Sequence, residues 1–313
     1  MHRLQGESST RRELRAPQGD GTRPILARFT SIGTRVALKA HRLAETSEGY
    51  SSAPADVSTE LRLMPLIEAM RPLRPRTMIM GLTTAGRPLL FDLESPVVYH
   101  MLIEGVQDGR AAEFLRTLAY SLALTTLPAQ VQLFPVDMSG SELVALEGLP
   151  HSPRGLVADR EGLDTLLKSV ESDIAGRQHS GARRPHLVVV AYGLQLLLQR
   201  NLQAQLNRII RLGEVGGPFG IHLLMAGADG VMNSPRVSGA LRKFAFVSIR
   251  PNVDQRRLKS AVVAVGDQKA TFVAATLTLD DLDRAFHQIA LTGRLDQRAS
   301  GLHVWPALSI GAA

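Results

Sequence analysis

The chain has 313 residues, of which 44% are hydrophobic, and a formal net charge of +7. This composition is sufficient for a sizeable apolar core in one large or two small domains. Cysteine is absent, which excludes disulfides and thiolate-bound metals and agrees with a reducing, cytoplasmic location. No apolar run reaches the roughly 20 residues that a membrane span needs, so we expect any membrane association to come through a partner complex.

The positive charge is concentrated at the N-terminus. Residues 1–40 hold eight basic and three acidic side chains, a net charge of +5. Residues 1–22 are polar and rich in Gly, Ser and Arg, and we expect them to form a disordered basic tail. Such a tail binds DNA, anionic lipid or an acidic partner through the same electrostatics, so charge alone does not choose among these partners.

Residues 23–77 are expected to form a β-containing segment and a proline-rich linker. From about Met78, strand patterns alternate with helical ones, which is typical of a mainly parallel sheet with helices on both faces. Strands are predicted at residues 88–93, 97–103, 131–137, 155–158, 186–192, 221–226 and 244–249. Helices are predicted at 113–122, 142–147, 159–175, 194–212 and 279–291, the third with Asp159 as its N-cap.

One stretch has the layout of a phosphate-binding loop, because an apolar strand enters a turn at Gly105 and a helix follows. A working loop reads G-x-x-x-x-G-K-[ST]; its backbone N–H groups and lysine hold phosphates, and its hydroxyl holds Mg²⁺. Counted from Gly105, the lysine and hydroxyl positions fall on Ala111 and Ala112. With Gly109 as the second glycine, they fall on Arg110 and Ala111. Neither register supplies a magnesium ligand.

Other polar residues have alternative interpretations. Asp137 ends the strand 131–137, at the edge where ligands bind in open α/β sheets, but a cap or turn role is open too. Arg110 is a candidate for contact with a phosphate, or with an acidic residue of a neighbouring subunit in a ring of subunits. Equally, it is open to interpretation as a solvated residue at the start of the helix. Four histidines stand at strand ends or in loops: His100, His151, His186 and His222. Their spacing is not that of metal ligands, so we expect them to have structural roles and to form no metal site.

Taken together, these segments resemble the FtsK/SpoIIIE family of RecA-like motor domains, and within it the EccC/EssC ATPases of type VII secretion. The most specific part is the block 128–151, which ends in Glu-Gly-Leu-Pro-His. The resemblance implies a RecA-like P-loop NTPase domain at 78–294 and an extended C-terminal connector at 295–313. Under it, residues 23–77 are open to interpretation as the tail of a preceding module.

The resemblance also identifies the positions of the catalytic groups. A motor of this family carries an Asp-Glu pair after its Walker B strand, the Asp for Mg²⁺ and the Glu for the attacking water. Here the strand is followed by Tyr192 and Gly193, and Ala228 stands near the position of a polar sensor residue. We therefore expect no catalytic residue and no ATP hydrolysis by this chain alone.

A degenerate nucleotide site remains a candidate, formed by Gly105, Gly109, Arg110 and Asp137. No cofactor is expected to be required, and residual ATP binding stays open. The favoured function is a catalytically degenerate module that binds or regulates a motor subunit or another FtsK/EccC-like module, a secreted substrate peptide, or both. The alternative is a DNA-binding subunit of an FtsK-like translocase with weak or borrowed ATP binding. An ATPase that uses Arg110 in place of lysine ranks last.

Overall fold

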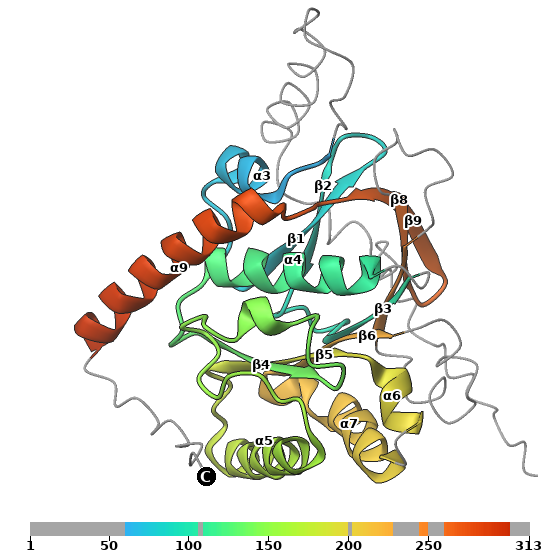
Figure 1. The fold of residues 1–313 in the computed structure, drawn as a ribbon, viewed down its shortest axis with the longest axis vertical. Helices are drawn as coiled ribbons and strands as arrows, with labels where there is room; N and C mark the ends of the chain where they lie inside the picture. Colours follow the sequence, from blue (N-terminus) through green and yellow to red (C-terminus); the bar gives the residue numbers. More distant parts are fainter. Residues whose placement is uncertain (1–59, 106–108, 200–201, 228–243, 250–259, 301–313) are drawn as a thin grey trace, which may run out of the picture.

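The computed structural model describes residues 60–105, 109–199, 202–227, 244–249 and 260–300. This part of the chain forms a nine-stranded mixed sheet with helices on both faces (Figure 1). The strands are β1 (Thr77–Thr83), β2 (Pro88–Asp92), β3 (His100–Gly105), β4 (Val131–Asp137), β5 (His186–Tyr192), β6 (Ile221–Gly227), β7 (Phe244–Ile249), β8 (Ser260–Val265) and β9 (Gln268–Ala274). Their order in the sheet is β2-β1-β9-β8-β7-β3-β6-β5-β4.

The sheet is parallel in one half only. The ladders that join β7, β3, β6, β5 and β4 are parallel, and those that join β7, β8, β9, β1 and β2 are antiparallel. The α/β, RecA-like fold class is confirmed, but the prediction of a mainly parallel sheet overlooked β1 and the hairpin of β8 and β9. That hairpin turns at Gly266, whose φ of +56° suits glycine.

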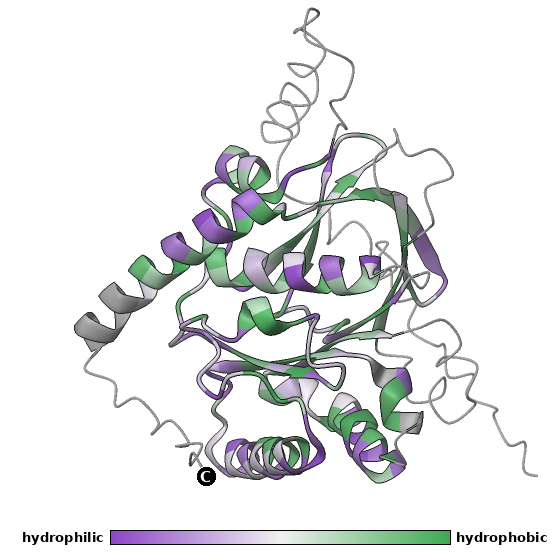
Figure 2. Ribbon diagram, in the orientation of Figure 1, coloured by the Kyte–Doolittle hydropathy of each residue, from purple (hydrophilic) through white to green (hydrophobic). Residues whose placement is uncertain are grey.

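The helices are α3 (Leu63–Met70), α4 (Arg110–Thr125), α5 (Arg160–Ser180), α6 (Leu194–Gln199), α7 (Gln203–Val215) and α9 (Leu279–Ser300), with the 3₁₀ turns η1 (Val144–Leu146) and η2 (Gly217–Phe219). An apolar cluster lies on each face of the sheet. Helices α3, α4 and α9 cover one face, and α5, α6 and α7 cover the other. Figure 2 shows apolar strands and mixed stripes along α5 and α9, as expected for helices with one buried side. None of the described helices is long and apolar enough to cross a membrane.

Helix α4 is enclosed on most of its sides. It lies between β1 and the strands β3, β5 and β6, because the sheet curls around it (Figure 1). Two of its buried polar side chains bind backbone groups of neighbouring elements: Ser121 Oγ accepts from the Ile79 N–H at 2.8 Å, and the Tyr120 hydroxyl donates to the Ala145 carbonyl at 2.7 Å. A helix with apolar residues on most of its sides is buried in this way. One partly exposed stripe of the helix carries charged side chains: Arg110, Glu113 and Arg116.

The folded unit begins before Met78, so the predicted domain start is too late in the chain. Leu63, in the first turn of α3, is fully buried, and its N–H donates to the Thr276 carbonyl at 2.8 Å. Arg62 pairs with the buried Asp281 carboxylate at the start of α9. The prediction of a proline-rich linker is wrong for this segment. Pro65 lies in the first turn of α3, where a missing N–H removes no helical hydrogen bond. Predictions for 1–59 lie outside the described residues.

Two helix ends differ from the predicted ones. Asp159 caps α5 as predicted, its Oδ1 accepting from the Gly162 N–H at 2.7 Å, but the helix continues to Ser180. Helix α9 likewise continues to Ser300, so residues 295–300 of the predicted extended connector are helical. No glycine or proline interrupts them, and Gly301 is the first residue that favours a helix end. Residues 301–313 lie outside the described part.

Two further segments are shorter than predicted. The helix predicted at 194–212 is divided into α6 and α7. The strand predicted at 155–158 is reduced to an isolated bridge between Val136 and Val157.

Four histidines are buried in the sheet or beside it. His186 Nδ1 lies 2.8 Å from His222 Nε2, and His100 Nδ1 accepts a backbone N–H at 3.2 Å. His151 Nε2 lies 3.1 Å from the Thr126 carbonyl oxygen. Burial lowers the pKa of His151 and of His186 to about 4 and that of His222 to about 3. His151, His186 and His222 are therefore neutral members of the packed interior at pH 7.

Replacing Ser121 with Ala should destabilise the protein by about 1–3 kcal/mol, because the buried Ile79 N–H would lose its acceptor. Urea unfolding measures this change. The matched control is Ser172→Ala on the exposed side of α5, which should change the free energy of unfolding by less than about 0.5 kcal/mol. An equal effect of the two substitutions would contradict the buried hydrogen bond.

The free energy of unfolding should fall as the pH drops from about 6.5 towards 4. In the unfolded chain a histidine binds a proton below its ordinary pKa of 6.5, whereas the folded state, with its lowered pKa values, does not. Each fully buried histidine contributes up to about 1.4 kcal/mol per pH unit. Urea unfolding at pH 7.5 and 5.5 measures the slope, and His151→Gln should reduce it. An unchanged slope in that variant would contradict the pKa assigned to His151.

Candidate functional site

The glycine turn lies at the centre of the sheet. Strand β3 ends at Gly105, and α4 begins at Arg110 directly after Gly109, which has a φ of +77°. In the sheet, β3 lies between β7 and β6. The connection after β3 leads towards β4 at one edge, whereas the connection after β6 leads in the opposite direction, to β7. In open α/β sheets such a switch point is where ligands bind, outside the carboxyl ends of the strands. The strand and the helix are thus arranged as predicted, and residues 106–108 between them lie outside the described part.

The start of α4 favours the register in which Gly109 is the second glycine. Arg110 then stands at the lysine position and Ala111 at the hydroxyl position. Ala111 is buried, and a Cβ built at Gly105 would lie 3.1 Å from the Ala111 methyl carbon. The position that binds Mg²⁺ in a working loop therefore carries a methyl group packed against the end of β3.

A small pocket lies beside the start of α4. Its walls come from the first turn of that helix and from the ends of β7 and β9: Arg110, Glu113, Phe114, Ile249, Ala274, Ala275 and Thr276. Its volume of about 10 Å³ leaves room for about one water molecule. This pocket is too small to hold a nucleotide.

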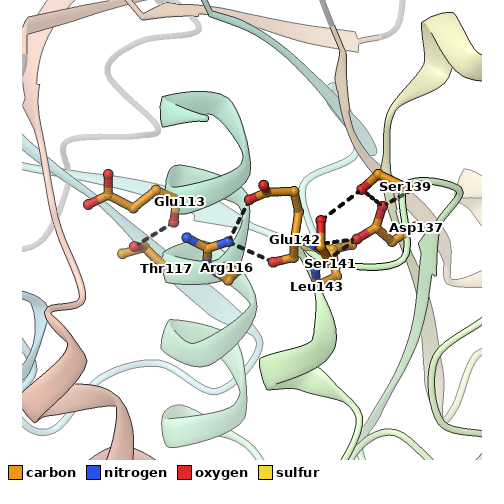
Figure 3. Close-up of polar contacts among 8 residues, drawn as sticks. All are labelled: Glu113, Arg116, Thr117, Asp137, Ser139, Ser141, Glu142 and Leu143. Carbon is orange, nitrogen blue, oxygen red and sulfur yellow. Dashed lines mark hydrogen bonds and ion pairs between the residues drawn. The ribbon is translucent and has the colours of Figure 1, made fainter. Parts of the chain in front are cut away.

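Asp137 organises the turn that follows β4. Its Oδ1 accepts from the Ser139 N–H at 2.9 Å, and its Oδ2 accepts from the N–H groups of Glu142 and Leu143 at 2.6 and 3.0 Å (Figure 3). Strand β4 is an edge strand rather than a central one. Three strand spacings separate it from β3, which is about 14 Å. The structure therefore does not bring Asp137 together with the glycine turn.

Arg116 and Glu142 form an ion pair that sequence reasoning missed. Arg116 Nη1 donates to the Glu142 carbonyl oxygen at 2.6 Å and to its carboxylate Oε2 at 3.1 Å (Figure 3). The pair ties the turn after β4 to the side of α4. The signal that could have revealed it is an arginine that follows buried apolar residues in the middle of α4, because a half-buried guanidinium needs an acceptor.

Tyr192 ends β5, where a motor of the family places its acidic pair. The pKa of its phenol is raised by partial burial and by the nearby carboxylates of Glu142 and Asp137. The ring packs against the same apolar cluster as α4. Gly193 follows with a φ of +79°. Strand β5 itself thus supplies no carboxylate at its end, although Asp137 of the neighbouring β4 lies opposite Tyr192.

These positions do not fit a magnesium–nucleotide complex. Mg²⁺ prefers carboxylate, hydroxyl and water oxygens, whereas Ala111 offers a methyl and both Asp137 oxygens accept from the turn. In the described part of the chain, no three or more His, Asp or Glu side chains are grouped so that they could hold a metal ion. Ala228 lies outside that part.

Known proteins share this organisation. Residues 71–180, from β1 to the end of α5, match the model of the FtsK/SpoIIIE family. The DNA translocase SftA of Bacillus subtilis (strain 168) is 25% identical over 254 residues, which cover 72% of this chain and 26% of SftA. This chain thus spans about a quarter of that relative's length.

Two solved structures share the fold. ATPases 2 and 3 of EssC from Geobacillus thermodenitrificans superpose with a TM-score of 0.61 at 15% identity, covering 79% of this chain and 53% of that one. Thermomonospora curvata EccC, ATPases 2 and 3 in complex with a signal sequence peptide, gives a TM-score of 0.54 at 19% identity, covering 76% and 50%. Residues 71–180 thus match the FtsK/SpoIIIE family model, and the chain is similar in sequence to a DNA translocase and in fold to the EssC and EccC ATPases.

Proposed function

We propose that this domain is a non-hydrolysing FtsK/SpoIIIE-type module that serves as a binding or regulatory unit. The observation that carries the proposal is the buried Ala111 methyl packed against Gly105, at the position of the magnesium-binding hydroxyl. Tyr192 and Gly193 at the Walker B strand end support it independently. Phosphoryl transfer depends on a metal clamp and a positioned water, and neither position supplies a ligand for them.

Arg110 does not restore this chemistry. As the first residue of α4 it lies at the positive end of the helix dipole, where anions are stabilised, so a phosphate contact without turnover is compatible with the proposal. A guanidinium, however, neither orders Mg²⁺ nor polarises water. The module would then sense or hold an anionic group rather than consume one.

The partner we favour is a protein. Support comes from the fold shared with EccC, whose ATPases 2 and 3 form a complex with a signal sequence peptide. DNA is the second candidate, because SftA is a DNA translocase and residues 1–40 carry a net charge of +5. In the favoured case, contact with DNA would be a property of the basic N-terminus and not of the folded domain.

Incubation with Mg-ATP should give no phosphate release above the rate without protein, because the magnesium ligands are missing. A phosphate-release assay on the full chain tests this. The double variant Arg110→Lys, Ala111→Thr should stay inactive as well, since Tyr192 and Gly193 remain. Hydrolysis of ATP by the unmodified chain would refute the proposal. Hydrolysis by the double variant alone would show that ATP hydrolysis does not require acidic residues at the end of the Walker B strand.

Any affinity for duplex DNA should vanish when the charge of the N-terminus is removed. The variant replaces five arginines with Gln: Arg3, Arg11, Arg12, Arg15 and Arg23. Fluorescence anisotropy with a duplex of about 20 base pairs, between 50 and 200 mM salt, measures the change, because counterion release makes phosphate contacts salt-dependent. Salt-sensitive binding retained by the variant would instead favour the DNA-translocase alternative.

A further inference from the structure

A cluster of charges lies away from the glycine turn, where three distant segments of the chain meet. Arg76 precedes β1, Glu94 follows β2, and Arg184 precedes β5. Strands β1 and β5 are far apart in the sheet order, but the curl of the sheet around α4 brings their first residues close together. We call these three residues the Glu94 cluster.

In this cluster one carboxylate oxygen serves two guanidinium groups. Glu94 Oε1 lies 2.8 Å from Arg76 Nη2 and 3.4 Å from Arg184 Nη2. The nearby Arg177 is already engaged, because it donates to the backbone carbonyls of Phe219 and Pro185 at 2.8 and 2.7 Å. Two positive charges thus share a single carboxylate, and the site has a surplus of both positive charge and hydrogen-bond donors.

The conformation of Arg76 is energetically unfavourable. The residue is 8% exposed, its φ is +64°, and its buried Nε has no acceptor. A non-glycine residue in this backbone region carries strain of about 1 kcal/mol or more, and a buried donor without a partner is costly as well. The backbone is held by the Leu93 N–H, which donates to the Arg76 carbonyl at 3.0 Å. The fold therefore presents a constrained guanidinium with unused donor capacity.

We propose that the Glu94 cluster is a recognition site for a carboxylate side chain of an acidic peptide segment on a partner protein, with Glu94 occupying the site when the partner is absent. The side chain of Glu94 is 40% exposed and that of Arg184 is 58% exposed, so both are accessible from solvent and Glu94 can swing outward. An incoming carboxylate would then receive hydrogen bonds from Arg76 and Arg184. This inference adds a partner chemistry and relies on no residue of the nucleotide site.

The same geometry disfavours a nucleic acid as the ligand. The present occupant is a carboxylate, which matches guanidinium donors in size and charge. Duplex DNA would place a row of phosphates across the surface, and there it would meet the carboxylates of Glu94 and of Asp92, which lies 3.5 Å from Arg74. Repulsion from these groups acts against a long polyanion more than against a single acidic side chain.

Binding of a fluorescein-labelled hexaglutamate peptide to the full chain tests the proposal. All proteins carry the five N-terminal Arg→Gln substitutions described above, so that the basic tail does not bind the probe. The informative variants are Arg184→Gln, Arg76→Gly and Glu94→Gln. Arg76→Gly removes the guanidinium but suits a φ of +64°, so it separates loss of binding from loss of folding. The matched control is Arg160→Gln, an exposed arginine at the start of α5, the end of that helix far from Arg184.

Arg184→Gln and Arg76→Gly should each weaken peptide binding about tenfold or more. Glu94→Gln should strengthen it by about threefold or more, because a competing charge is removed. Arg160→Gln should stay within about twofold of the parent. The proposal is overturned if the parent does not bind the peptide, if Arg160→Gln weakens binding as much as Arg184→Gln, or if duplex DNA binds more tightly with the same dependence on Arg76 and Arg184.

Discussion

Enclosure of α4 by the curled sheet determines how the rest of the domain is arranged. Because most residues of the helix are buried, it is covered by β1 on one side, by the parallel strands on the other and by α3 and α9 where the sheet is open. Each polar side chain that this enclosure traps needs a partner on a neighbouring element. Ser121 therefore binds β1, and Tyr120 and Arg116 bind the segment after β4.

The same enclosure fixes the start of α4. In a working loop the first helical turn presents a hydroxyl and a lysine to phosphates. Here Ala111 and Ala112 are buried, and the helix start is packed against the end of β3. Nearby, the turn after β4 is fixed by Asp137 from one side and by Arg116 from the other. The packing that stabilises the fold thus occupies groups that a motor would keep available.

Curling of the sheet has a second consequence at the first residues of β1 and β5. It brings Arg76, Glu94 and Arg184 together although Glu94 and Arg184 are 90 residues apart in sequence. The buried histidines stay neutral at pH 7 because desolvation disfavours their charged form. In the Glu94 cluster, by contrast, the guanidinium groups remain charged, and this contrast makes the cluster a candidate for binding while the histidines contribute to stability.

Local features of the fold could be predicted from sequence because they depend on neighbours in the chain. The apolar runs of β4, β5 and β7, the N-cap at Asp159 and the strand–glycine–helix layout at Gly105 are of this kind. So is the absence of lysine and hydroxyl at the start of α4. One error arose where a local signal had two meanings: the prolines before Met78 suggested a linker, although Pro65 fits a first helical turn. Another came from the resemblance, which implied an extended connector from residue 295, although α9 runs to Ser300.

The sequence by itself determined the fold class, the family resemblance and the lack of a lysine and a hydroxyl residue at the start of α4, because periodicity and motif spacing are properties of short stretches. Only the tertiary structure decided that Asp137 lies at the sheet edge, that Arg116 meets Glu142, and that Glu94 joins two distant arginines. Those contacts depend on strand order and on the curl of the sheet around α4. Both arise from packing between segments far apart in the chain, which no local pattern encodes.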